Sequence, residues 1–284
     1  GLTVLVMCRK FTGLPDWRPE GEAQVIRVPS LGSRKFDLEA KSAVNFLISL
    51  SFCLNLMIYL IRHRKEYDIV HFHGASLQLI LNVLPLKLMN KKIVAKVAGA
   101  KMNIEAGSFR GKYLFLGNLF VRILRSVDMF VAITDEIRID LIREGYHPER
   151  IFKASNFIAP QHFYPEEDSG NRNTIRKRLG INEGKKVITF SGRLVRRKRL
   201  DVLLDAVAGV CQKRKDFIVV ILGTGELMEY LRRYTAALGI SEVVVFRGNV
   251  PNVLDYLQVS DLYLLTSETE GMPNSLLEAM ACRL

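Results

Sequence analysis

Two glutamates, Glu270 and Glu278, flank a Gly-Met-Pro turn near the end of the chain. A strand-like run ends near Thr266, and the pattern predicts a tight turn followed by a helix that begins at Asn274 or Ser275. Free backbone N–H groups at a helix start, with the helix dipole behind them, suit an anion such as a diphosphate. Glu270 is expected at the carboxyl end of the strand, where open α/β sheets bind ligands.

A structural alternative exists for the second glutamate. Ser275 and Glu278 fit the S-x-x-E capping box, in which the glutamate serves only the helix. Capping does not account for Glu270 eight residues earlier, so we favour a binding role for the turn.

A basic loop follows a second strand-like run, which ends at Gly192. Five of the next seven residues are cationic: Arg193, Arg196, Arg197, Lys198 and Arg199. Arginine forks and lysine point charges at the end of a strand can neutralise a pyrophosphate. The alternative is a solvated surface loop.

The stretch EGMPNSLLEAMA, which spaces Glu270 and Glu278, resembles the signature of the family 4 retaining glycosyltransferases. The resemblance implies that Glu270 contacts the transferred sugar and acts as the catalytic residue, and that Glu278 holds the ribose of a nucleotide. It also implies that backbone amides between them meet the sugar and the diphosphate. Those residues are Gly271, Met272, Pro273, Asn274, Ser275 and Leu276.

The basic loop is similar to the GRL-x3-K pattern of the same family. By this resemblance Arg193 and Lys198, next to Gly192, are the diphosphate ligands, and the other three arginines are surface residues. The family often has glycine at the position of Arg199, so we expect a different local backbone there.

Two weaker matches follow in the expected order. Gly223 and Thr224 lie in a stretch that resembles the family's GxG turn, and Phe246 and Arg247 lie where the backbone would read the base. Glycine lets a ligand approach the main chain closely. Either stretch could also be an ordinary loop.

The first half of the chain carries weaker signals. His71 and His73 alternate in a DxxHxHG-like strand and so share a face; we interpret them as packing or cleft wall rather than as metal ligands. Ala98 stands where many relatives have a histidine that contacts the donor sugar. The stretch Ser155-Asn-Phe157 lies where the family often has a PNG turn.

Short apolar runs alternate with amphipathic stretches along most of the chain, which predicts an α/β fold with parallel sheets covered by helices on both faces. The domains are expected at residues 1–158 and 174–284, with a polar, proline-bearing linker at 159–173. The resemblance implies the GT-B fold, two Rossmann-like domains facing each other across a cleft. It also implies an opening strand and loop before residue 1, and final strands and a helix after residue 284, which turnover requires.

The strands are expected at 3–7, 68–73, 92–97, 129–133, 186–190, 217–222, 243–246 and 262–265, and two of the helices at 201–213 and 226–238.

The net charge of +12 is concentrated in the first half, which has 23 basic and 14 acidic residues up to Ile158. Such a surface can attract nucleic acid, an anionic membrane or a phosphorylated substrate. We expect no nucleic-acid partner, because no nucleic-acid motif or aromatic platform is evident. Four scattered cysteines without a CxxC pair indicate reduced thiols and a cytoplasmic protein.

The run from Ser42 to Ile61 is uncharged and would just span a bilayer. Its polar residues fall on two opposite helix faces, so we favour a buried helix, with a membrane-contacting helix as the alternative. A second apolar and basic stretch runs from Arg110 to Arg125. An anionic membrane surface is therefore a candidate partner, with the protein on the inner face of the membrane.

Together these features predict a metal-independent hexosyltransferase without a cofactor. It would transfer sugar from a nucleoside-diphosphate sugar to a lipid-linked or saccharide acceptor, with retention of configuration, in polysaccharide or glycolipid synthesis. Arg193, Lys198 and the helix amides would stabilise the departing diphosphate. The alternatives are a GT-B epimerase or phosphorylase and a non-catalytic basic binding protein; a dehydrogenase is disfavoured because no GxGxxG motif opens a helix.

Overall fold

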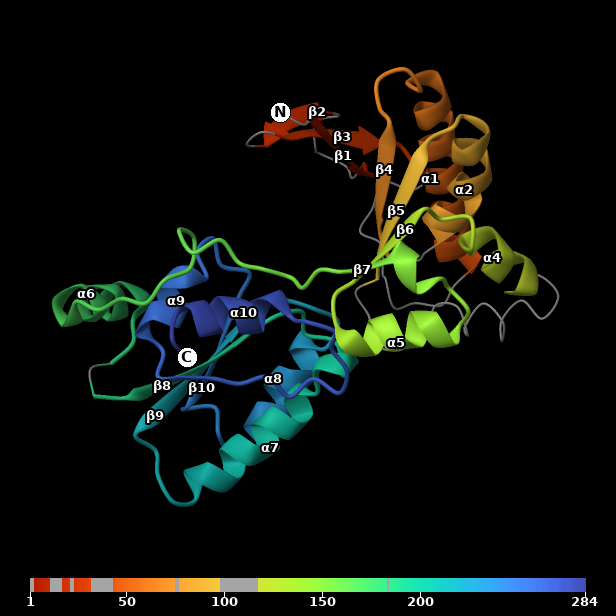
Figure 1. The fold of residues 1–284 in the computed structure, drawn as a ribbon. Helices are drawn as coiled ribbons and strands as arrows, with labels where there is room; N and C mark the ends of the chain where they lie inside the picture. The colour runs from red at the N-terminus through yellow and green to blue at the C-terminus, as the bar shows by residue number, and fades with distance from the viewer. Residues whose placement is uncertain are drawn as a thin grey trace. The chain divides into compact units, whose positions relative to one another are not determined.

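The computed structural model describes residues 3–10, 17–20, 23–31, 43–74, 77–97, 117–182 and 184–284. The chain divides into two compact units, Gly1–Ala154 and Ser155–Leu284 (Figure 1). This boundary lies four residues before the predicted end of the first domain. The last residues of the predicted linker, from Ser169 onward, are helical.

The first unit contains two sheets. In one, β1 (Val4–Arg9) pairs in parallel with β3 (Ala23–Val28), and β2 (Trp17–Glu20) pairs antiparallel with β3. The other is parallel throughout and has the order β4-β5-β6-β7. Its strands are β4 (Ile69–His73), β5 (Lys92–Val97), β6 (Met129–Ala132) and β7 (Ile151–Lys153). The predicted strands of this half are confirmed, whereas β2, β3 and β7 were not predicted.

The described helices of the first unit are α1 (Ala43–Arg62), α2 (Leu77–Leu88), α4 (Gly117–Leu124) and α5 (Asp135–Arg143). Helices α1 and α4 both pack against α2, and one face of α2 is almost wholly buried. Thr134 caps α5 by accepting a hydrogen bond from the Ile137 amide. Of the predicted 110–125 stretch, the residues before Gly117 lie outside the described part, and Val121 and Leu124 are core residues.

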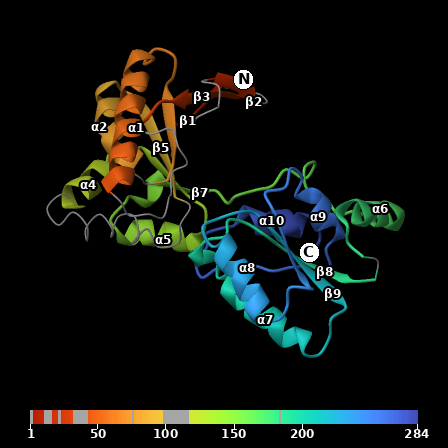
Figure 2. The same cartoon turned by 180° about the vertical axis from the view of Figure 1, so that it is seen from behind.

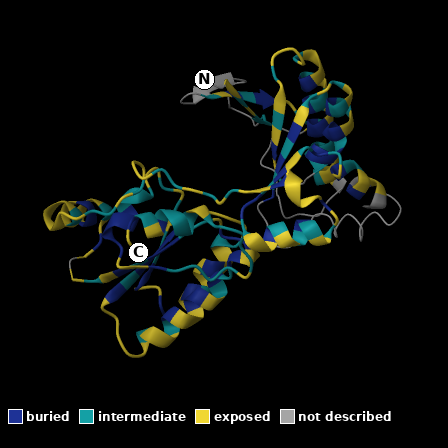
Figure 3. Cartoon of the chain, viewed as in Figure 1, coloured by how far each residue is buried: buried dark blue, intermediate teal, exposed yellow. Residues whose placement is uncertain are grey.

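Helix α1 corrects the prediction of a buried helix over 42–61. Phe52, Cys53, Leu56 and Leu60 are buried on one face, but the opposite face is largely exposed (Figure 3). Besides Phe46, five exposed apolar residues recur every three to seven positions and therefore share that face: Val44, Leu47, Leu54, Ile58 and Ile61. Ser42 lies outside the described residues.

The second unit is a four-stranded parallel sheet in the order β10-β9-β8-β11. Its strands are β8 (Lys186–Ser191), β9 (Phe217–Leu222), β10 (Val244–Gly248) and β11 (Leu262–Tyr263), as predicted within a few residues. The helices are α6 (Ser169–Leu179), α7 (Leu200–Cys211), α8 (Met228–Ala237), α9 (Leu254–Val259) and α10 (Asn274–Ala281), seen from both sides in Figures 1 and 2.

Both faces of this second sheet are buried, as the sequence predicted. Val219 and Ile221 of β9 point into a core shared with α7 and α8, whereas Val220 and Leu222 point into a core shared with α6 and α9. Alternate residues of a strand face opposite sides, so an uninterrupted apolar run requires helices on both. All four cysteines of the chain are free thiols.

Candidate functional site

The candidate site lies at the carboxyl edge of the second unit's sheet. Parallel strands end at the same edge, so the loops after β8, β9 and β10 lie side by side. Backbone hydrogen bonds join them: Gly192 donates to Leu222, Gly223 donates to Gly248, and Leu194 donates to Thr224. The basic loop and the GxG turn are therefore one connected structure.

The glycines of the GxG turn are required by this contact between loops. Gly223 has φ +116°, and a Cβ atom there would lie 2.0 Å from the carbonyl oxygen of Gly192. A Cβ atom at Gly225 would lie 2.3 Å from the Leu194 carbonyl oxygen. Close approach of two backbones, rather than of a ligand, thus explains both glycines.

Arg199 adopts the left-handed backbone conformation that favours glycine, with φ 47° and ψ 46°. The expectation of a different backbone at this position was wrong: the arginine keeps the glycine-like conformation. Two guanidinium nitrogens bind the Asp201 carboxylate at 3.0–3.1 Å, which holds the residue in place just before α7. Thr266 also donates to the carbonyls of Lys198 and Arg199 at 3.0 Å.

Glu270 and the basic loop form an ion-pair cluster. The Lys198 Nζ atom lies 2.6 Å from Glu270 Oε1, and Arg197 Nη1 lies 3.5 Å from Glu270 Oε2. Both members of the closer pair are largely withdrawn from solvent, with side chains 10% and 18% exposed. Arg197 is exposed, as the sequence predicted, and its side chain also donates to the Thr269 carbonyl at 3.1 Å.

The cluster holds Glu270 in its charged form. Burial alone would raise the pKa of Glu270, but the hydrogen bond and charge of Lys198, together with Arg197, bring that pKa below its usual value. A carboxylate that is buried next to a cation is stable only while the partner is present. Glu270 and Lys198 therefore depend on each other.

Helix α10 begins at Asn274, as predicted, and its start carries no side-chain cap. Pro273 is the N-cap residue and has no hydrogen-bonding side chain, and Ser275 lies within the first turn. The capping-box alternative therefore fails, because its serine would have to precede the helix. The Leu276 and Leu277 amides donate to the Pro273 carbonyl, whereas the two amides before them have no acceptor among the described residues.

Glu278 and Tyr263 lie close to the start of α10. Burial raises the pKa of Glu278, and the described residues offer it no ion pair. The Tyr263 hydroxyl donates to the Ser191 carbonyl at 3.1 Å, and burial raises its pKa; Ser275, Glu278 and Glu270 are close enough to influence that pKa. Tyr263 thus connects the end of β8 with the first turn of α10.

Some predicted residues are not gathered into this cluster. The Arg247 side chain turns away and donates to the Leu179 carbonyl at the end of α6 at 2.7 Å. Phe246 packs under Arg232, whose guanidinium lies 5.4 Å from the ring centre. Thr224 contacts Asn249, at 3.3 Å, and Arg193 is exposed at the surface of the basic loop.

In the first unit, the rings of His71 and His73 lie on one exposed face of β4 with their centres 4.8 Å apart. Burial, His73 and Lys96 lower the pKa of His71, which favours the neutral ring. The described residues contain no group of three or more side chains able to hold a metal ion. Ala98 lies outside the described residues.

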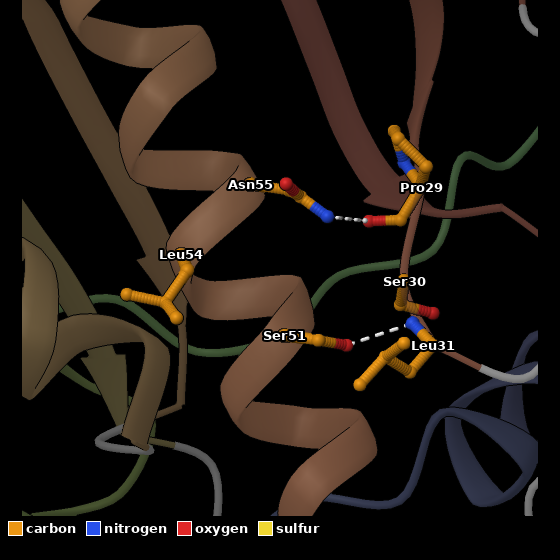
Figure 4. Close-up of a pocket in the computed structure, with 6 residues that line it drawn as sticks. All are labelled: Pro29, Ser30, Leu31, Ser51, Leu54 and Asn55. Atoms are coloured by element: carbon orange, nitrogen blue, oxygen red, sulfur yellow. Dashed lines mark hydrogen bonds between the residues drawn. The ribbon is translucent and has the colours of Figure 1, made fainter.

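A shallow hollow lies between α1 and the segment after β3 (Figure 4). Ser51 and Asn55 point into it and hydrogen-bond to that segment, through the Leu31 amide at 2.8 Å and the Pro29 carbonyl at 3.0 Å. Leu54 points away from this contact. Ser51 and Asn55 of α1 therefore hold the chain after β3.

Sequence reasoning missed three residues of the site. Arg197 was within the basic loop but could not be told from its neighbours. Asn156 was noted only by its position, yet it donates to the Met272 carbonyl at 2.8 Å and to the Asn274 side chain at 2.9 Å. Tyr263 gave no signal, because an aromatic residue in a short strand is ordinary core.

Residues 171–284 match the family described as Glycosyl transferases group 1. The chain is 27% identical over 225 residues to N-acetyl-alpha-D-glucosaminyl L-malate synthase of Bacillus anthracis, covering 78% of this chain and 56% of the relative. It is 25% identical over 244 residues to the Escherichia coli enzyme UDP-Gal:alpha-D-GlcNAc-diphosphoundecaprenol alpha-1,3-galactosyltransferase, covering 81% and 59%. The chain thus spans little more than half the length of these relatives.

Two solved structures share the fold. WaaG, a glycosyltransferase involved in lipopolysaccharide biosynthesis, superposes with a TM-score of 0.73 at 19% identity, over all of this chain and 72% of WaaG. Anabaena HepE in complex with UDP and glucose gives 0.70 at 16% identity, over 91% of this chain and 65% of HepE. The chain therefore has the α/β fold of the GT-B glycosyltransferases, and its second unit matches the group 1 glycosyl transferase family.

Proposed function

We propose that the protein transfers a hexosyl group from a nucleoside-diphosphate sugar to an acceptor hydroxyl, with retention of configuration, as a family 4 glycosyltransferase. The observation that carries this proposal is the Lys198–Glu270 pair, at 2.6 Å, on the loop beside the uncapped start of α10. One buried cation, one partly buried carboxylate and free helix amides meet at the carboxyl edge of a parallel sheet, where such sheets bind ligands.

Each group has a distinct part in this reaction. Lys198, the exposed Arg193 and the amides that open α10 would stabilise the negative charge on the departing diphosphate. Glu270 would accept hydrogen bonds from the sugar once the diphosphate engages Lys198. Glu278, a partly buried carboxylate with no ion pair among the described residues, would accept hydrogen bonds from the two ribose hydroxyls.

The donor and acceptor classes are supported by relatives of this chain. HepE was solved with UDP and glucose, and the E. coli relative is named for a UDP-sugar donor and a lipid-linked acceptor. We extend both to this chain: a nucleotide sugar as donor and a lipid-linked or saccharide acceptor. A GT-B phosphorylase would instead require inorganic phosphate, and an epimerase would convert the donor without an acceptor.

Nucleotide binding is expected to need no divalent metal, because Lys198, Arg193 and the helix amides supply the positive charge. Titration calorimetry should give the same affinity for UDP or GDP in EDTA as in magnesium. Inorganic sulfate serves as the control anion and should bind much more weakly. Equal affinity for sulfate and nucleoside diphosphate would contradict a shaped nucleotide site, and loss of binding in EDTA would contradict metal independence.

We further propose that the first unit docks on an anionic membrane through α1. Five apolar side chains on one face of the helix are 39–62% exposed, and the helix leads into exposed Arg62, Arg64 and Lys65. By length and composition Val44–Arg62 could also cross a bilayer, which by itself is weak evidence. We favour docking because Ser51 and Asn55 are engaged in hydrogen bonds within the unit.

Removing the apolar face should release the protein from vesicles. A Leu47→Gln/Leu54→Gln variant is expected to lose most of its co-sedimentation with anionic liposomes. Membrane binding depends on both apolar insertion and the basic residues, each of which contributes about 1 kcal/mol near an anionic surface. Val202→Gln/Val210→Gln is the matched control, since these valines are exposed to a similar extent on α7. High salt should release the bound wild type. Binding that survives high salt and alkaline carbonate would mean insertion, and no binding to any vesicle would refute docking.

A further inference from the structure

Asn156 is the second residue of the second unit, yet it reaches the turn before α10. Its side-chain amide donates to the Met272 carbonyl at 2.8 Å and to Asn274 Oδ1 at 2.9 Å, across more than a hundred residues of chain. The carbonyl of Met272 can only accept, so the contacting atom of Asn156 is the amide nitrogen. The contacting atom of Asn274 is then its oxygen.

This second hydrogen bond fixes the orientation of the Asn274 side chain. Asn274 is the first residue of the helix and not its N-cap, but an asparagine oxygen also accepts from the backbone N–H of its own or a neighbouring residue. Here that oxygen is engaged by Asn156, and Pro273 contributes no cap. The amides that open α10 are therefore left available to an incoming anion.

The first hydrogen bond fixes the turn itself. Met272 lies between Gly271 and Pro273, after the residues that the basic loop holds through Arg197 at Thr269 and Lys198 at Glu270. An amide that holds the Met272 carbonyl restricts rotation of the peptide that precedes Pro273. A backbone segment that is fixed before binding does not have to be ordered when the ligand binds, so its conformational entropy is not lost at that step.

We propose that Asn156 is a positioning residue, which keeps the turn in its binding conformation and keeps the Asn274 side chain off the helix amides. The proposal deepens the proposed function and rests on it, because it concerns the diphosphate part of the same site. It assigns a role in the donor site to the segment that begins the second unit.

The test uses two measurements on Asn156→Ala. Hydrogen exchange without nucleotide should become about tenfold faster at residues 271–277. The dissociation constant for UDP or GDP should rise about five- to tenfold. Gln258→Ala is the matched control, because it removes another amide-to-carbonyl bond to the start of the unit, to Tyr164 at 3.2 Å, away from the turn. Gln258→Ala should change the melting temperature as much as Asn156→Ala does. It should change neither hydrogen exchange at residues 271–277 nor the dissociation constant for UDP or GDP.

A double variant separates the two hydrogen bonds. If Asn156 keeps the Asn274 side chain away from the amides, the double variant Asn156→Ala/Asn274→Ala should bind nucleotide more tightly than Asn156→Ala. A double-mutant cycle with both single variants measures this coupling. Unchanged exchange at the turn in Asn156→Ala, or equal effects in Gln258→Ala, would overturn the proposal. Failure of the wild type to bind nucleotide would count against the proposed function alone, since the exchange measurement needs no nucleotide.

Discussion

Lys198→Ala is expected to weaken binding of a nucleoside diphosphate by about 10- to 100-fold, the largest effect of any single change in the basic loop. A hydrogen bond to a charged group contributes about 1.5–3 kcal/mol, and 1.4 kcal/mol is a factor of ten. The same change leaves Glu270 buried without its closest cation, so the fold should also lose stability. Calorimetric titration with UDP and GDP, combined with urea unfolding, measures both effects.

The neighbouring arginines provide the controls. Arg196→Ala removes an equal charge from an exposed position, and no ion pair of this side chain is recorded among the described residues. We expect a small effect there, a large one for Arg193→Ala on affinity alone, and an intermediate one for Arg197→Ala, since Arg197 also faces Glu270. Equal losses in all four variants would point to diffuse electrostatic attraction instead of a shaped site.

The strands of the second unit were predictable because their residues are apolar on both faces. Phe217–Leu222 is buried along nearly its whole length, and such an apolar run is typical of a strand whose alternate side chains face opposite sides of a covered sheet. The antiparallel pairing of β2 with β3 was harder to predict from the sequence. Trp17–Glu20 contains a proline and two charges in four residues, and such a short edge strand carries little periodic signal.

The start of α10 was predictable from the residues alone, but the partners of the turn were not. Gly271 and Pro273 mark the break between strand and helix within a few residues of each other. Lys198 and Glu270 are 72 residues apart, and Asn156 lies 116 residues before Met272. Contacts of this kind depend on how the whole unit folds, which a local pattern does not encode.

Helix α1 shows where composition misleads. An uncharged run of twenty residues predicts burial on all sides, because solvent-exposed faces usually carry charge. The observed helix buries one face and exposes another that is equally apolar. Ser51 and Asn55, which looked like a break in the apolar pattern, are used to hold the segment after β3.

The two glutamates of the turn are expected to affect stability with opposite signs. The folded-state pKa of Glu270 is lowered, so its contribution to stability is present above the unfolded pKa, about 4.3, and is lost as the pH falls through the folded pKa. Glu270→Gln should therefore cost about 1.5–3 kcal/mol at pH 7. The folded-state pKa of Glu278 is raised by burial, so the ionised side chain opposes folding at neutral pH. Glu278→Gln should stabilise the fold at pH 7, and this gain should vanish as the pH falls below about 4.3.

The two glutamates should also differ in their effects on nucleotide binding and turnover. Glu278→Gln is expected to weaken nucleotide binding about tenfold or more while it stabilises the fold, because it removes the acceptor for the ribose hydroxyls. Glu270→Gln should mainly lower turnover and leave nucleotide affinity equal or higher, since Lys198 is then free to bind the diphosphate. Urea unfolding at pH 7 and pH 4, nucleotide titration and a sugar-transfer assay separate these effects. A Glu278→Gln variant that is less stable than the wild type, with unchanged nucleotide affinity, would mean that this glutamate serves the helix alone.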